Sequence, residues 1–284
     1  TSEAAAQLLR SRAAPDATLL KPVDLVVLKL ENSSHRLAYT SAVSSGNQVN
    51  RVFIDPGSGV GLLRYSLIQK QSGIGTGRGV LGDTKKMSVR PQGGAYVADD
   101  RLRPPVLATF DMRGNLNRAL NVLMGAPLFV ADIATDTDND WTDVSAVDAH
   151  AYIGWTYDYY FKRHGRRGLD NRDRPLISLI NGVTQQAALT LAPEDFGLFA
   201  TNAFWCDVCG PGGVGTIYFG NGFPQPFFDG LGRNWTYLAG SLDVVAHELT
   251  HGVTSSSSNL ILGNEPGALN EAFSDMFGIG ASFA

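Results

Sequence analysis

The residues best suited to chemistry lie between positions 241 and 275, near the end of the 284-residue chain. His247 and His251 are four positions apart, and Glu248 directly follows the first of them. One turn of helix takes about 3.6 residues, so this spacing places both histidines on one face, where they can bind one metal ion. Imidazole nitrogens are common ligands of zinc, and His-Glu-x-x-His on a helix is a zinc-binding pattern.

A second set of side chains follows after a short interval. Glu271 and Asp275 are again four apart and would share one face of a helix that begins at about Gly267. If the two helices meet, His247, His251 and Glu271 can bind one zinc ion and leave its fourth position open, as in catalytic zinc sites. The alternative is a chance pair of solvated or hydrogen-bonded histidines. The chain has only 5 histidines, and the downstream acidic pair weakens that alternative further.

The residues around the histidines predict the helix that carries them. Ser241 is a candidate N-cap, and Asp243 places negative charge in the first turn. Val244 and Leu249 supply an apolar face. We therefore expect this helix to begin just after residue 241.

Two segments, VVAHELTH at 244–251 and GALNEAFSD at 267–275, resemble the thermolysin-like zinc neutral metalloproteases. The resemblance implies a secreted enzyme with an α+β fold: a mainly β amino-terminal region followed by the active-site helices. It also implies that Zn²⁺ activates a water molecule and that Glu248 is the general base of a zinc endopeptidase. Asp275 would accept a hydrogen bond from a ligand histidine and hold its tautomer.

The same resemblance places the substrate. Asn202 and Ala203 match a family segment that runs along the cleft as an edge strand, where an extended peptide can pair with free backbone groups. The alternative is an ordinary buried aromatic strand. Trp235, Leu238 and Val244 match the wall of the pocket for the residue after the scissile bond. The expected partner is a peptide or protein substrate.

Two departures from the family pattern bear on activity. Leu262 stands where the family has a tyrosine that helps to hold the oxyanion, and a leucine side chain donates no hydrogen bond. The chain stops at Ala284, so the family's carboxy-terminal helical domain is absent from it. We therefore expect a second partner, the carboxy-terminal half of the protease. The competing interpretation is a non-catalytic or zymogen-like metal-binding fragment.

Calcium is the second predicted cofactor. Asp136, Asp138 and Asp140 alternate along the chain, and Ca²⁺ prefers such hard oxygen ligands. The loop lacks the glycine and closing glutamate of an EF-hand, and a solvated acidic loop is the alternative. The resemblance favours calcium here and adds Asp243, while a family calcium glutamate is replaced by Ser282.

Cys206 and Cys209 are the only cysteines. A Cys-x-x-Cys pair can be a redox centre, half of a zinc site, or a short disulfide. The chain has no second cysteine pair for a structural zinc and no thioredoxin-like context. For an exported protein, the pattern favours a disulfide.

The chain divides into three predicted parts. Residues 1–70 read as a short helix and strands at 24–30, 36–40, 51–55 and 61–65, and resemble a pro-region remnant that would act as inhibitor or chaperone. Residues 71–79 are glycine-rich and predict a linker. Residues 80–284 resemble the amino-terminal part of the catalytic domain, with a long core helix at 146–162 that contains a structural His150.

Bulk composition excludes other classes of protein. The chain is 44% hydrophobic and 18% charged, which suffices for one or two real cores. Its net charge is −4, and no basic block predicts a nucleic-acid partner. No apolar run approaches the length of a membrane span.

Overall fold

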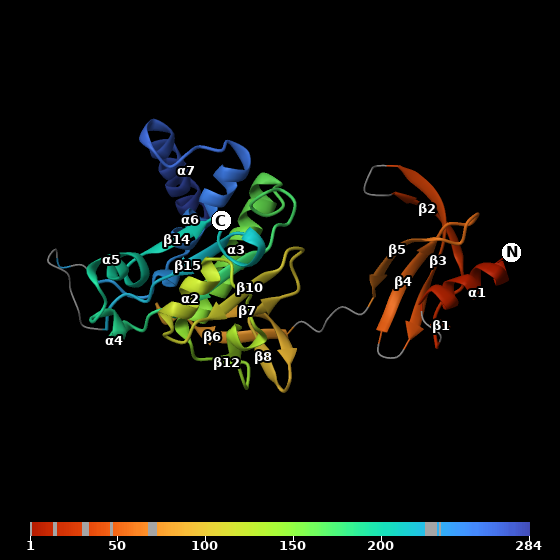
Figure 1. Cartoon of the computed structure of the whole chain (residues 1–284), viewed down its shortest axis with the longest axis horizontal. Coiled ribbons are helices and arrows are strands. Elements are labelled where there is room, and N and C mark those ends of the chain that lie inside the picture. Colours follow the sequence, from red (N-terminus) through yellow and green to blue (C-terminus); the bar gives the residue numbers. More distant parts are fainter. Residues whose placement is uncertain are drawn as a thin grey trace. The chain divides into compact units, whose positions relative to one another are not determined.

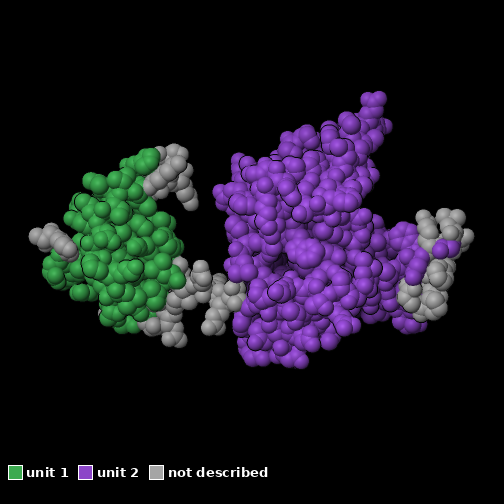
Figure 2. All heavy atoms as spheres, turned by 180° about the vertical axis from the view of Figure 1, so that it is seen from behind, with its two compact units in different colours: residues 1–70 green, residues 71–284 purple. Residues whose placement is uncertain are grey.

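The structure is a computed structural model that describes residues 2–13, 16–29, 34–45, 48–67, 73–224, 232 and 234–284. The chain divides into two compact units, Thr1–Lys70 (unit 1) and Gln71–Ala284 (unit 2), which Figure 2 draws in different colours. Each unit buries a core of its own. The mixed helix and sheet content predicted from the sequence is confirmed (Figure 1).

Unit 1 is an antiparallel sheet that packs against one helix. Its elements are α1 (Ser2–Ala13), β1 (Thr18–Leu19), β2 (Asp24–Lys29), β3 (His35–Ser45), β4 (Gln48–Ile54) and β5 (Gly61–Ser66). The order in the sheet is β1-β3-β4-β5, and β2 also pairs with β3. Leu9 of α1 packs against Val43, Val52 and Ile54. The helix and strands predicted here are confirmed, and Leu30 lies outside the described residues.

Unit 2 contains two sheets. The first has the order β11-β8-β7-β6-β12, from β6 (Gly73–Arg78), β7 (Thr84–Gln92), β8 (Ala95–Val97), β11 (Thr135–Asp136) and β12 (Asp140–Trp141). The second has the order β14-β15-β13-β10-β9, from β9 (Asp99–Asp100), β10 (Leu107–Asp111), β13 (Leu176–Ile180), β14 (Ala203–Cys206) and β15 (Thr216–Phe219). Strand β14 lies antiparallel to β15 and forms one edge of this sheet. Shorter helices α2 (Leu116–Leu123), α4 (Gln185–Ala188) and α5 (Pro193–Asp195) flank the second sheet (Figure 1).

The prediction of a linker at 71–79 is wrong for residues 73–78. They form β6, which pairs with β7 along its length and with β12 at its other edge. The glycines serve close packing: a Cβ at Gly75 would lie 2.7 Å from Trp141 Nε1, and a Cβ at Gly77 would lie 2.5 Å from Val147 Cγ2. Glycine marks close approach as well as flexibility, and the sequence alone does not separate the two. Residues 68–72 lie outside the described residues.

Helix α3 (Val144–His164) is the buried centre of unit 2. It begins at Asp143, whose carboxylate accepts the N–H groups of Ser145 and Ala146, and it ends at Gly165, which has a φ of 62°. His150 lies on this helix and links the two sheets: Nδ1 is 3.0 Å from Thr109 Oγ1, and Nε2 is 2.7 Å from the Ser88 carbonyl oxygen. Burial lowers the pKa of His150 and keeps the ring neutral. These contacts agree with the predicted structural role.

Helices α6 (Leu242–Ser257) and α7 (Asn264–Ser282) pack against each other and carry the predicted metal ligands. Gly278 allows their close approach, because a Cβ there would lie 2.6 Å from the carbonyl oxygen of Asp243. Helix α6 begins where the sequence predicts, but the Ser241 side chain does not cap it. Asp243 instead accepts the N–H of Val244 and the hydroxyl of Ser241. Helix α7 begins at Asn264, slightly before the predicted Gly267.

Candidate metal centre and active-site cleft

Three side chains from α6 and α7 converge on one point. Nε2 of His247 and Nε2 of His251 are 3.2 Å apart, and Oε2 of Glu271 is 3.3 Å from the first and 3.7 Å from the second. Ligands bonded at about 2.0–2.1 Å to a tetrahedral zinc ion are about 3.3 Å apart. Two imidazoles and one carboxylate at these distances therefore fit three corners of a zinc tetrahedron. Across the described part of the chain, they are the one convergent group of three or more His, Cys, Asp or Glu ligand atoms.

The predicted partner of a ligand histidine is in place. Nδ1 of His247 is 2.9 Å from Oδ1 of Asp275, which lies one helical turn after Glu271 on α7. A carboxylate at Nδ1 holds the proton on that nitrogen and leaves Nε2 as a lone-pair donor for a metal. The hydrogen bond therefore prepares His247 as a ligand.

His251 has a partner that the sequence analysis did not assign. Its Nδ1 is 2.9 Å from Oδ1 of Asn270 and 3.2 Å from the hydroxyl of Ser274. Nδ2 of Asn270 donates to the carbonyl oxygen of Leu260, which orients the amide so that its oxygen faces the imidazole. The one signal in the sequence was that Asn270 directly precedes Glu271. The structure adds that Asn270 is a buried polar residue of α7.

Glu248 is half-buried beside this group, at the edge of the second sheet. Its Oε2 accepts the backbone N–H of Trp205 in β14 at 3.0 Å. Burial and, to a smaller extent, the negative charge of Glu271 raise the pKa of Glu248 to about 8, although the hydrogen bond from the Trp205 N–H acts in the opposite direction. A metal cation bound beside it would lower the pKa again. The carboxyl group is thus suited to accept and return a proton near neutral pH.

A cleft of about 640 Å³ opens over the three convergent side chains. One wall is β14 with the residue before it, and the other is the loop between α6 and α7. Asn202, Ala203 and Leu262 all line it, together with Glu248 and the metal-binding group. Leu262 is 74% exposed and places an apolar side chain at the mouth of the cleft.

The predicted pocket residues are not all in that cleft. Trp235 and Leu238 do not line it among the described residues, and Leu238 packs on the core of unit 2. Val244 lines a neighbouring hollow of about 300 Å³, which it shares with Asp243, Glu248 and Ile279. The structure thus brings Asn202 and Ala203 to the candidate centre, with Val244 next to it and Trp235 and Leu238 apart from it.

The acidic loop is arranged differently. Asp136 Oδ1 accepts the backbone N–H groups of Asp138 and Asn139, and Asp138 Oδ1 accepts the N–H of Asp140. These carboxylates stabilise their own turn, and in the described residues they do not converge as a ligand group with one another or with Asp243. Asp243 lies instead in the first turn of α6.

Cys206 and Cys209 form a disulfide, as the sequence predicts. The bond closes the short loop that follows β14. The redox-centre and zinc-site alternatives are not needed to explain the pair.

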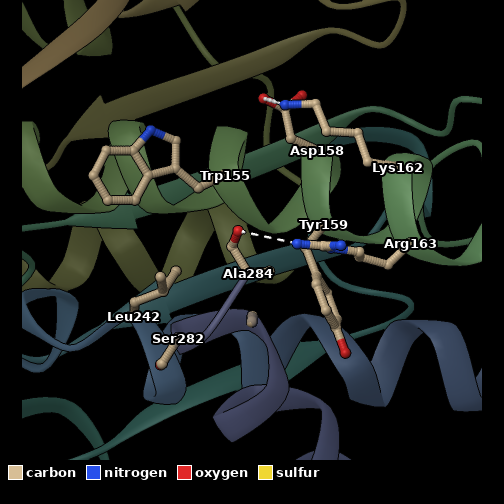
Figure 3. Close-up of a pocket in the computed structure, with 9 residues that line it drawn as sticks. Trp155, Asp158, Tyr159, Lys162, Arg163, Leu242, Ser282 and Ala284 are labelled. Atoms are coloured by element: carbon tan, nitrogen blue, oxygen red, sulfur yellow. Dashed lines mark hydrogen bonds and ion pairs between the residues drawn. The ribbon is translucent and has the colours of Figure 1, made fainter.

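A second hollow, of about 600 Å³, lies among α3, the start of α6 and the end of α7. Figure 3 shows its residues: Arg163 donates to the carbonyl oxygen of Ala284, and Lys162 pairs with Asp158. Trp155 and Leu242 supply apolar surface. None of the predicted catalytic, metal or substrate residues lines it.

The family model described as the thermolysin metallopeptidase catalytic domain matches residues 74–255. This match covers more than half of the chain and includes both histidines of the candidate centre. The chain belongs to the thermolysin family of metallopeptidases.

Curated relatives agree with the family model. The chain is 38% identical over 208 residues to the bacillolysin of Bacillus cereus, which covers 72% of this chain and 30% of that protein. It is 35% identical over 226 residues to the bacillolysin of Brevibacillus brevis, covering 80% of this chain and 35% of that protein. It is 34% identical over 230 residues to an extracellular elastase of Staphylococcus epidermidis, covering 80% and 38%. The chain thus spans about a third of the length of these relatives.

One solved structure is more distantly similar. The precursor of protealysin, a metalloproteinase from Serratia proteamaculans, is 24% identical, with a TM-score of 0.44 over 63% of this chain and 43% of that chain. That likeness is too remote to carry an argument. Separately, none of the helices among the described residues has the length and apolar character needed to cross a membrane.

Proposed function

We propose that this chain is the amino-terminal part of a secreted zinc endopeptidase. The observation that carries the proposal is the spacing of 3.2 to 3.7 Å among the ligand atoms of His247, His251 and Glu271. That spacing suits three ligands of one tetrahedral zinc ion with an open position. Membership of the thermolysin family and the extracellular elastase among the relatives support the same activity and location.

The residues around the centre have distinct tasks in the proposed reaction. Bound zinc would supply Lewis acidity and lower the pKa of a water molecule towards ~7. Glu248 takes a proton from the attacking water at its carboxylate and returns that proton to the leaving amine. Asp275 and Asn270 hold the imidazoles of His247 and His251 in the orientation that ligation requires.

The substrate is a peptide that lies extended along β14. Asn202 and Ala203 line the cleft at the edge of the second sheet, where backbone groups can pair with another chain. Val244 lines the neighbouring hollow, and we assign it to the pocket for the residue after the scissile bond. Trp235 and Leu238 keep their proposed place in that pocket on family resemblance alone.

Three further parts complete the proposal. Unit 1 is a pro-region remnant that acts as inhibitor or chaperone of a zymogen. A carboxy-terminal half supplies the oxyanion and substrate contacts that Leu262 cannot. Calcium binds at Asp136, Asp138 and Asp140; the support is the alternation of three carboxylates in one turn, each with oxygen lone pairs to spare.

The proposed base can be tested without disturbing the metal. Glu248→Gln, made in the protein that includes the carboxy-terminal half, should keep about one zinc per chain and lose roughly 100-fold or more of kcat. Glu265→Gln, an exposed glutamate in the first turn of α7, is the matched control and should keep both zinc and activity. Zinc content and peptide cleavage are measured on the same samples. Full turnover by zinc-loaded Glu248→Gln would remove Glu248 from the mechanism.

A further inference from the structure

Trp205 lies in the wall of the cleft and contacts Glu248, the proposed base. Its backbone N–H donates to Oε2 of Glu248, and its strand continues from Asn202 and Ala203, which line the cleft. Within the described part of the chain, no other hydrogen-bond donor reaches the Glu248 carboxylate. The place of that carboxylate therefore depends on the place of Trp205.

The Trp205 indole is held from several sides. It lies against α6 at Gly252, where a Cβ would come within 2.9 Å of indole Cε2, and against Gly215, where a Cβ would come within 2.6 Å of Cζ2. Its Nε1–H donates to Oδ1 of Asp207 at 2.9 Å. Gly252 lies four residues after Glu248, so the ring packs on the next turn of the helix that carries the base.

Arg174 holds the loop that follows β14. Its Nη2 donates to the carbonyl oxygen of Asp207, and its Nε donates to that of Val214, each at 2.5 Å. The guanidinium also lies 5.7 Å from the centre of the Trp205 ring. The side chain is only 21% exposed, so these charge-assisted bonds are largely shielded from water. One residue thus restrains both ends of the loop and one face of the indole.

The disulfide closes the same loop. Cys206 directly follows Trp205 and is bonded to Cys209. The carbonyl oxygen of Cys209 accepts the N–H of Gly215 and the hydroxyl of Thr216 on the neighbouring strand. The crosslink and Arg174 therefore restrain one short segment, and that segment continues the strand residue that contacts Glu248.

We propose that Arg174 and the Cys206–Cys209 loop form a clamp that positions the general base by holding the Trp205 N–H against Glu248. This inference rests on the proposed peptidase function. Arg174 acts through Trp205, so it is a positioning residue. Misplacing a reacting group by about 1 Å can cost about 100-fold in rate. A loosened clamp should lower kcat more than it changes KM, because the hydrogen bonds of Arg174 go to residues after Trp205, whereas Asn202 and Ala203 precede it.

The test is Arg174→Met in the zinc-loaded protein that includes the carboxy-terminal half. Its matched control is Arg118→Met, because Arg118 forms a comparably shielded ion pair with Asp132 in the same unit, with a side chain 19% exposed. Arg174→Met should keep its zinc, lower kcat by about 10–100-fold and leave KM little changed. Arg118→Met should keep the kcat of the wild type.

Amide hydrogen exchange at Trp205 reports on the clamp without any need for activity. Glu248→Ala removes the acceptor and sets the rate for a free N–H. Arg174→Met should shift the Trp205 exchange towards that rate, and Arg118→Met should not. If Arg174→Met does not fold, the double variant Cys206→Ala, Cys209→Ala loosens the same loop and carries the same expectations.

The outcomes separate the two proposals. Wild-type kcat together with wild-type exchange at Trp205 in the loop variants would overturn the clamp and leave the peptidase proposal standing. A wild-type protein that holds zinc and cleaves no peptide would overturn the peptidase proposal. In that case the exchange rate at Trp205 still decides whether Arg174 holds the strand against Glu248.

Discussion

Both predicted metal sites of this chain were inferred from regularly spaced side chains. The structure arranges those side chains differently at the two sites. At the helix pair, His247, His251 and Glu271 bring their ligand atoms within 3.7 Å of one another. In the acidic loop, Asp136 and Asp138 use one oxygen each to accept N–H groups of their own turn. Regular spacing predicted a metal site in both places, but the ligand atoms converge only at the helix pair.

The difference lies in what holds each side chain. A helix fixes the direction of residues four apart, so the spacing of His247 and His251 already implies convergence. Residues in a loop have no such fixed relation, and Asp side chains readily bond to backbone N–H groups nearby. Spacing is therefore strong evidence for a metal site on a helix and weaker evidence in a turn.

Removing a ligand at the helix pair should have the largest effect. We expect about one zinc per chain in the wild type and almost none in His251→Ala or Glu271→Ala, because two remaining ligands cannot hold the ion. His164→Ala, a change in a histidine outside the cluster, is the control and should keep zinc. Elemental analysis of purified protein measures the zinc content. Equal zinc in all four proteins would contradict the assignment of His251 and Glu271 as zinc ligands.

The presence or absence of the proposed carboxy-terminal half should have the next largest effect. Loss of one oxyanion donor costs on the order of 10²–10³ in rate. On the family resemblance, Leu262 already stands in the place of one such donor. We expect residues 1–284 alone to bind zinc but to cleave casein or short peptides weakly or not at all. Activity should return when the other half is added. If residues 1–284 cleave peptides equally well with and without the proposed half, the oxyanion is held some other way.

The hydrogen-bond partners of the histidines should matter less than the ligands do. Asp275→Ala frees the Nδ1 of His247, and Asn270→Ala leaves the Nδ1 of His251 with only the Ser274 hydroxyl. We expect either change to lower zinc affinity about 10–100-fold. Competition with a chelator measures the affinity. Asp138→Ala in the acidic loop should leave zinc affinity unchanged. An Asp275→Ala protein that binds zinc as tightly as the wild type would show that α6 alone orients His247.

Calcium at the acidic loop should give the smallest effect. A ligand that binds only the folded state adds about 2.7 kcal/mol at 100 times its Kd, and a domain of this size gains about 2–4 °C in Tm per kcal/mol. We expect added Ca²⁺ to raise Tm and Asp138→Ala to abolish that rise, with Asp195→Ala as an acidic control elsewhere. A calcium response that survives in Asp138→Ala would mean that the loop carboxylates serve only their own turn.

The sequence determined the parts of this protein that depend on local periodicity. Four-residue spacing on two helices predicted the pairs His247/His251 and Glu271/Asp275, and the short separation of Cys206 and Cys209 allowed a disulfide. The segments at 24–30, 36–40, 51–55 and 61–65 predicted the strands of unit 1. Each of these follows from the geometry of a single element or turn, which the chain carries wherever it folds.

Tertiary structure decided which residues meet across elements. Trp205 and Glu248 are far apart in the chain, and no periodicity relates a strand N–H to a helix carboxylate. In the sequence, Gly75 and Gly77 predict a flexible linker. In the structure, Trp141 and Val147 pack closely against them. Asn270 became a partner of His251 only when α7 lay against α6 at Gly278. Such contacts arise from close packing of separate elements, and packing depends on shape in three dimensions that spacing along the chain does not record.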